Sequence, residues 1–189
     1  MKRFLLILMI TAACAGLFAQ NKTELPKGQV VLFDGFENGN YWIWAGFDWD
    51  QYGTHKYSSG ANISMDWASE GRHSLELTME PMPADKPKSA VWFYDGTNDL
   101  TGAKYLVFDV YNPEDYTYNV AAVIQATDSW KWCQTQYYNV PKGVHTFVFD
   151  LSEYTELLHD VRRISLTHDG WQATNRDTHI YIDNIRYIK

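Results

Sequence analysis

The chain has 189 residues, of which 16 are basic and 23 acidic, giving a net charge of −7. A chain this acidic, with no cluster of Lys or Arg in its sequence, argues against nucleic acid and anionic membranes as partners. Aromatic residues make up 16% of the chain and include eight Trp, which is more than a core needs. We therefore expect some of these rings to act at a surface.

Residues 1–19 predict an export signal. A basic start precedes the apolar run Phe4–Ala13, and small residues form a cleavage site before Gln20. The run is too short to span a bilayer and no other segment is long and apolar enough, so we expect a secreted or periplasmic protein without a transmembrane segment. The alternative is a lipoprotein signal acylated at Cys14, although Thr11 stands where such signals usually carry Leu.

Residues 20–28 predict a disordered leader, and residues 29–189 predict one domain with a sizeable core. Leu151–His159 predicts a helical turn capped by Ser152. Elsewhere, alternating side chains and closely spaced turn signals predict about ten strands. This pattern favours an all-β fold, an antiparallel β-sandwich of the jelly-roll type. The expected strands are Gln29–Phe33, Tyr41–Trp49 (a strand edge or an aromatic loop), Asn62–Trp67, Ser74–Glu80, Ala90–Tyr94, Lys104–Tyr111, two within Tyr118–Tyr138, Gly143–Asp150, Arg163–Thr167 and His179–Ile188.

The stretch Tyr118–Tyr138 predicts a hairpin with a turn at Thr127–Ser129. Side chains alternate along a strand, so its second strand would carry two Trp, two Gln and a Tyr on one face. Buried amides need several hydrogen-bond partners, which makes this face a poor core. It suits a carbohydrate, because pyranose C–H faces pack on rings while hydroxyls bond amides and carboxylates. With the neighbouring strands in register, the predicted ligand-binding residues are Trp92, Tyr94, Asp109, Tyr111, Gln125, Trp130, Trp132, Gln134, Gln136 and Tyr138. Trp171 is also predicted to bind the ligand and, with Trp42, Trp44 and Trp49, would form a wall of the same cleft or of a second site.

Carboxylates occur near both ends of the predicted domain. Asp34 and Glu37 follow the first strand, and Asp183 lies in the last. Terminal strands of a sandwich are often neighbours, and Ca²⁺ takes about 6–8 oxygen ligands. The sequence therefore predicts a structural calcium ion held by these three carboxylates and backbone carbonyls of Gly71–His73. The alternative is that Asp34 makes an Asx turn and Asp183 hydrogen-bonds a neighbouring strand.

Catalytic motifs are absent from the sequence: it holds no Gly-x-Ser-x-Gly, no His-Glu-x-x-His and no phosphate-binding glycine loop. His168 and Asp169 form the one His/Asp pair beside expected site residues, and Cys133 predicts a small buried hydrophobe. We expect a non-catalytic carbohydrate-binding protein. The alternatives are a polysaccharide-degrading jelly-roll hydrolase or lyase, and a structural or adhesive protein of the cell envelope that uses its rings as protein contacts.

Four segments together resemble the calcium-containing β-jelly-roll carbohydrate-binding modules, galactose-binding-like sandwiches attached to glucanases, mannanases and similar enzymes. They are Leu32–Gly39 (LFDGFENG), Ser69–Leu75 (SEGRHSL), Lys104–Pro113 (KYLVFDVYNP) and Tyr181–Ile185 (YIDNI). The resemblance implies a structural calcium ion near Glu37 and Asp183 and a glycan cleft on the concave sheet. Such modules usually accompany a catalytic domain and these residues contain none, which leaves open a free binding protein, a surface-associated component, or a protein whose function no longer involves sugar.

Overall fold

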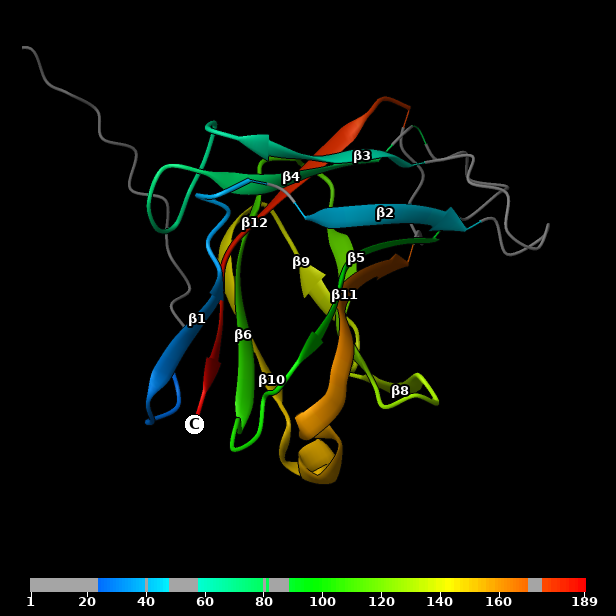
Figure 1. Ribbon diagram of the computed structural model, residues 1–189. Helices are drawn as coiled ribbons and strands as arrows, with labels where there is room; N and C mark the ends of the chain where they lie inside the picture. Colours follow the sequence, from blue (N-terminus) through cyan, green and yellow to red (C-terminus); the bar gives the residue numbers. More distant parts are fainter. Residues whose placement is uncertain (1–23, 40, 48–57, 80, 82–88, 170–174) are drawn as a thin grey trace, which may run out of the picture.

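The computed structural model describes residues 24–39, 41–47, 58–79, 81, 89–169 and 175–189, and within them the chain forms a sandwich of two six-stranded antiparallel sheets (Figure 1). Both sheets draw on strands that lie far apart in the sequence. Sheet A has the order β10 (Gly143–Asp150), β6 (Tyr105–Asn112), β12 (Thr178–Ile188), β4 (Ser74–Met79) and β3 (Ser58–Ser64), with β1 (Val30–Asp34) also paired to β12. Sheet B has the order β2 (Trp42–Phe47), β5 (Ser89–Asn98), β11 (Val161–Asp169), β7 (Tyr118–Ala126) and β8 (Lys131–Gln134), with β9 (Tyr138–Val140) also paired to β7.

The core lies between the two sheets and follows the alternation that the sequence predicts. Every second residue of β6 and β7 faces it, because successive side chains of a strand point to opposite faces. The intervening residues of both strands face outward. The buried core residues of these two strands are Leu106, Phe108, Val110, Tyr118, Val120, Ala122 and Ile124.

The predicted all-β jelly-roll sandwich is confirmed, and most predicted strands are present with ends shifted by a few residues. The strand expected at Asn62–Trp67 is instead β3, Ser58–Ser64. Leu151–His159 corresponds to η2 (Ser152–Asp160), a 3₁₀ helix whose first turn has no side-chain cap. The predicted Ser152 cap is therefore wrong: Ser152 N donates to Asp150 Oδ1 at 2.9 Å instead.

A β-bulge divides the second strand of the predicted hairpin into β8 and β9, both of which pair with β7. Gln134 lies opposite Val123, and Tyr138 lies opposite Val120. The outer strand thus takes one more residue than β7 between the two pairs, which reverses the side that later residues face. The predicted common face of Trp132, Gln134, Gln136 and Tyr138 therefore ends at Gln134.

None of the helices within the described residues is long and apolar enough to cross a membrane.

Candidate functional site

The outer side of sheet B carries the cluster that we call the hairpin face: Gln125, Trp130, Trp132 and Gln134 of the β7–β8 hairpin, with Asp95 of β5 and Arg163 of β11. Register places them together, since Gln125 lies opposite both Trp132 and Arg163, and Arg163 lies opposite Asp95. Trp130 and Trp132 remain 42% and 50% exposed. The face offers two exposed indoles beside amide and charged groups.

Hydrogen bonds and a cation–π contact orient the side chains of the hairpin face. Trp132 Nε1 donates to Gln134 Oε1 at 3.0 Å. Arg163 donates from Nε and Nη2 to the two carboxylate oxygens of Asp95, at 2.5 and 2.8 Å, and its guanidinium lies 5.2 Å from the centre of the Trp130 ring. Because these contacts hold the side chains before a ligand arrives, binding costs less side-chain entropy.

The turn from β7 to β8 holds Trp130 in an unusual backbone conformation. Trp130 has φ 53° and Thr127 has φ 64°, a left-handed region that bulky residues seldom adopt. Trp130 N donates to Thr127 O at 3.0 Å, and Thr127 N donates to Asp160 O at the end of η2 at 2.8 Å. Non-glycine residues in this region cluster at functional sites, where surrounding contacts maintain them. Here the turn brings the Trp130 ring beside Arg163.

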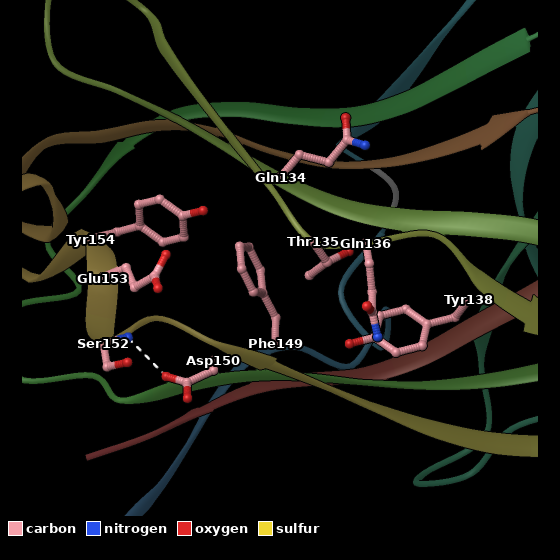
Figure 2. A pocket seen from close by; sticks show the side chains of 9 residues that line it. All are labelled: Gln134, Thr135, Gln136, Tyr138, Phe149, Asp150, Ser152, Glu153 and Tyr154. Carbon is pink, nitrogen blue, oxygen red and sulfur yellow. Dashed lines mark hydrogen bonds between the residues drawn. The ribbon is translucent and has the colours of Figure 1, made fainter.

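Beyond the bulge, Gln136 and Tyr138 line a different place, a lateral cleft of about 390 Å³ at the edge between the two sheets (Figure 2). Tyr138 turns toward Phe147 of β10, with ring centroids 5.5 Å apart. The other wall of the cleft comes from the end of β10 and the start of η2. The full lining is Gln134, Thr135, Gln136, Tyr138, Phe149, Asp150, Ser152, Glu153 and Tyr154.

Two predicted ligand-binding residues lie on the other sheet. Asp109 and Tyr111 point outward, as their alternation predicts, but from β6 of sheet A. The expectation that they share a sheet with the hairpin is wrong. Tyr111 stacks with Tyr181 at 5.9 Å and lies 5.5 Å from Trp67, while Asp109 is buried in an ion pair with Arg186.

Among the predicted aromatic residues outside the hairpin, Tyr94 does not join the hairpin face. Tyr94 packs against the core from within, with Phe33 and the buried Trp42 as ring neighbours at 5.3 and 6.3 Å. Trp92 pairs through its backbone with Leu166, and its side chain lies outside the described part. Trp171 lies outside it as well, and so do Trp49 and the side chain of Trp44.

The three carboxylates expected to bind calcium accept hydrogen bonds from the protein in this structure. Asp34 Oδ1 accepts from Phe36 N at 2.8 Å and Oδ2 from Trp42 Nε1 at 3.1 Å. Asp183 Oδ2 accepts from the backbone nitrogens of Ser69 and Glu70 at 2.7 and 2.9 Å, and burial raises the pKa of this carboxyl.

This donor set fits hydrogen-bonded turns, the alternative left open above, better than a calcium ion. Hydrogen-bond donors, namely backbone N–H groups and the Trp42 indole N–H, surround these carboxylates, whereas a Ca²⁺ ion requires oxygen ligands around it. Among the described residues, no group of three or more Asp, Glu, His or Cys side chains lies close enough together to hold a metal ion. The calcium site stays a prediction, which thermal unfolding with added Ca²⁺ and with EDTA tests.

The hydrogen bonds of Glu37 predict that the free energy of unfolding depends on pH in the acid range. Backbone hydrogen bonds from Arg72 and His73, at 2.6 and 2.7 Å, together with the His73 ring lower the pKa of Glu37 from 4.5 to about 2. A carboxylate whose pKa is depressed by folding stabilises the protein above its unfolded pKa and loses that contribution as pH falls through its folded value. We expect Glu37→Gln to be less stable at neutral pH, with the difference from wild type shrinking between pH 4.5 and 2. Urea unfolding of both proteins across this range measures it, and a difference independent of pH would contradict it.

His168, the histidine of the sequence's His168–Asp169 pair, belongs to the core. Its side chain is fully buried, Nδ1 lies 3.1 Å from Asn119 O and Nε2 lies 3.3 Å from Tyr116 Oη. Burial lowers its pKa to about 4, so the ring is neutral at physiological pH. A buried neutral ring among aromatic neighbours is out of reach of a ligand on either outer face.

Residues 35–184 match the family model described as mannanase, galactose-binding domain-like. The chain belongs to this family. No curated protein matches the sequence. Membership in the mannanase galactose-binding-like family agrees with the sandwich fold and with the motif segments at both ends of the domain.

Several solved structures similar to this family member are β-sandwich carbohydrate-binding modules. The first, described as a promiscuously specific module of the β-sandwich superfamily, is 15% identical with a TM-score of 0.62, and the match covers 82% of this chain and 60% of that one. The Caldicellulosiruptor saccharolyticus CBM27-1 module, solved with mannohexaose, is 17% identical with a TM-score of 0.58, covering 85% and 97%. A CBM28 module specific for non-crystalline cellulose is 17% identical with a TM-score of 0.55, covering 87% and 97%. At these identities the likeness establishes the fold.

Sequence reasoning missed the residues that other segments contribute. Asp95 and Arg163 join the hairpin face only through strand pairing. Asp150, Glu153 and Tyr154 join the lateral cleft only because η2 follows the strand at the edge of sheet A. No local pattern marks them, although the unusual density of polar and aromatic residues from 149 to 154 is a compositional signal.

Proposed function

We propose that this protein binds a polysaccharide or oligosaccharide on the hairpin face without transforming it. The observation that carries the proposal is the pair of exposed indoles, Trp130 and Trp132, fixed beside Gln125 and Gln134 on the outer side of sheet B. Indole rings supply flat apolar area with little entropy to lose, and amides orient hydroxyl groups.

The charges on the hairpin face favour an uncharged glycan. Its one acid and its one base, Asp95 and Arg163, form a two-point ion pair with each other. A sugar carboxylate or sulfate would have to compete with Asp95 for the guanidinium, which costs binding energy. Neutral hydroxyls can add hydrogen bonds around this pair without breaking it.

The structural neighbours support the same ligand class. Their descriptions name mannohexaose, non-crystalline cellulose and, for a Clostridium thermocellum family 11 module with a TM-score of 0.53 and 15% identity, a β-1,3-1,4-mixed-linked tetrasaccharide. We extend this class to the present chain as neutral β-linked glucans or mannans. Residues 1–19 further support a proposal that binding occurs outside the cytoplasm, with lipid attachment at Cys14 as the alternative.

Hydrolysis is the second candidate, because the lateral cleft contains the two carboxylates Asp150 and Glu153. A general acid needs a raised pKa, whereas the hydrogen bond from Ser152 N lowers the pKa of Asp150. Asp150 therefore does not fit the role of the general acid. Direct product analysis separates the two functions.

The test is a titration of the protein with soluble glucans, mannans and xylans, followed by tryptophan fluorescence and calorimetry, with product analysis of the same samples. We expect saturable binding to at least one neutral β-linked glycan and no released sugar. No response across the panel would overturn the proposal and favour the envelope-adhesion alternative. Released oligosaccharides would favour the hydrolase alternative.

Replacing Trp130 by glycine is predicted to separate stability from binding. Glycine relieves the strain of the positive φ, which stabilises the variant by about 1–2 kcal/mol. Two losses offset this gain: the cation–π contact, worth about 0.5–1 kcal/mol, and the greater conformational freedom of glycine in the unfolded chain. We expect the free energy of unfolding to change by less than about 1 kcal/mol while glycan affinity falls. Urea unfolding and calorimetry measure the two quantities, and unchanged affinity would remove Trp130 from the site.

A further inference from the structure

We propose that the lateral cleft is a second sugar site, separate from the hairpin face, which takes a single pyranose that is either neutral or carries an amino group. The cleft lies at the open edge of the sandwich, between the bulge that follows β8 on one side and the β10–η2 junction on the other (Figure 2). Its volume of about 390 Å³ is near the lower end of the usual range for small-molecule sites, about 300–1,000 Å³.

Aromatic rings from both sides of the cleft supply its apolar surface. Tyr138 comes from β9 of sheet B and packs against Phe147. Phe149 comes from β10 of sheet A, and Tyr154 of η2 meets its ring edge-on, with centroids 5.9 Å apart and planes at 70°. Each ring is therefore braced by another ring and retains little freedom. Phe149 is only 4% exposed and supports the other rings from the core, so the half-buried rings of Tyr138 and Tyr154 are the ones that can pack against the C–H faces of a pyranose.

Several polar groups around these rings have no hydrogen-bond partner in the part of the chain that the structure describes. Among the described residues, none forms a hydrogen bond with the Gln136 amide, the Glu153 carboxylate, or the hydroxyls of Tyr138 and Tyr154. Asp150 differs, because its Oδ1 accepts from Ser152 N, as the dashed line in Figure 2 shows. The cleft thus presents an amide, two phenolic hydroxyls and carboxylate oxygens around an aromatic surface. This combination matches the alternating C–H and O–H groups of a sugar.

The charge of the cleft restricts the sugar. Its lining contains two acidic residues, Asp150 and Glu153, and no Lys, Arg or His. The hydrogen bond from Ser152 N lowers the pKa of Asp150 and keeps that side chain ionised. A uronic acid or sulfated sugar would meet like charge without a cation to pair with. Neutral hexoses meet acceptors for their hydroxyls, and a 2-amino sugar also gains an ionic contact.

The bulge after β8 creates this cleft. A regular strand would carry Tyr138 on the same outer face as Gln134, whereas the extra residue turns Tyr138 toward sheet A. It also leaves Gln136 at the edge, exposed and outside either strand. Bulges are frequent beside functional sites because they redirect side chains in this way.

The test is a ¹H–¹⁵N NMR titration of the full chain with glucose, mannose, galactose, their 2-amino counterparts and the corresponding uronic acids. We expect shifts of the Gln136 side-chain amide with at least one neutral or amino sugar at millimolar concentration, smaller shifts of the Trp132 indole N–H, and none with the uronic acids. Gln136→Ala and Glu153→Ala, both at exposed positions, should weaken this binding at least fivefold. Trp132→Ala should leave it unchanged.

The proposal is overturned if no neutral or amino sugar shifts the Gln136 amide, if uronic acids bind equally well, or if both cleft variants retain wild-type affinity. It is also overturned if Trp132→Ala abolishes monosaccharide binding, because a single site would then account for both ligands. These results leave the proposed function intact, since polysaccharide binding that depends on Trp132 is measured separately. Loss of polysaccharide binding in the cleft variants would also overturn the proposal of a separate site, because the cleft and the hairpin face would then form one site.

Discussion

Trp132→Ala should abolish most polysaccharide binding while leaving the protein folded. Half of the Trp132 side chain is exposed, and its indole N–H donates to the neighbouring Gln134. It stands on β8 at the edge of sheet B, with its side chain turned away from the core that Cys133 enters. Removing a central aromatic anchor typically costs 2 kcal/mol or more of binding free energy, so we expect an affinity at least about 30-fold weaker.

The matched control is Tyr41→Ala, another exposed ring, which lines a cleft with Leu32 and Tyr187 beside β1. In Figure 1, β1 and β8 lie on opposite sides of the molecule. Calorimetry with the best glycan of the panel should detect loss of binding in the Trp132 variant alone, with circular dichroism confirming that both variants are folded. Wild-type affinity in folded Trp132→Ala would move the glycan site away from the hairpin face.

The alternation of side chains along single strands could be predicted from the sequence more reliably than the pairing of distant strands. The outward direction of Gln125, Trp132 and Gln134 follows from period 2 across a short turn, and the structure confirms it. Asp109 and Tyr111 also face outward as their alternation predicts. Membership of β6 in sheet A, however, depends on its pairing with β10 and β12, whose sequences lie far away.

Two other differences between the structure and the sequence predictions have local physical causes. Both faces of the segment around Tyr94 carry apolar or aromatic residues, so its sequence did not distinguish the inward from the outward face. Between Gln134 and Tyr138, one extra residue reverses the alternation, and no Gly or Pro marks the bulge. The hairpin face could therefore be predicted in its centre, but its neighbours across the sheet and the separate lateral cleft could not.

Asp109, predicted from sequence as a ligand-binding residue, should instead affect folding most strongly. Arg186 Nη1 and Nη2 donate to the two carboxylate oxygens of Asp109, at 3.0 and 3.2 Å. The side chains of the pair are only 8% and 10% exposed. Asp109 also accepts from Ser69 Oγ at 3.0 Å, Thr146 Oγ1 at 2.8 Å and Asn184 Nδ2 at 2.9 Å. One carboxylate thus links β6 to β10, to β12 and to the turn before β4.

Asp109→Leu should destabilise the protein by about 3–5 kcal/mol, because it leaves the Arg186 guanidinium buried without a counter-charge. That is a large share of the 5–15 kcal/mol typical of a domain. Arg186→Met should cost a similar amount, and the double variant should be less destabilised than the sum of the two, because an apolar pair leaves no unpaired charge. Urea unfolding of the four proteins measures this coupling. If Asp109→Leu instead unfolded like wild type and lost glycan binding, Asp109 would return to the binding site and the outer side of sheet A would become the glycan face.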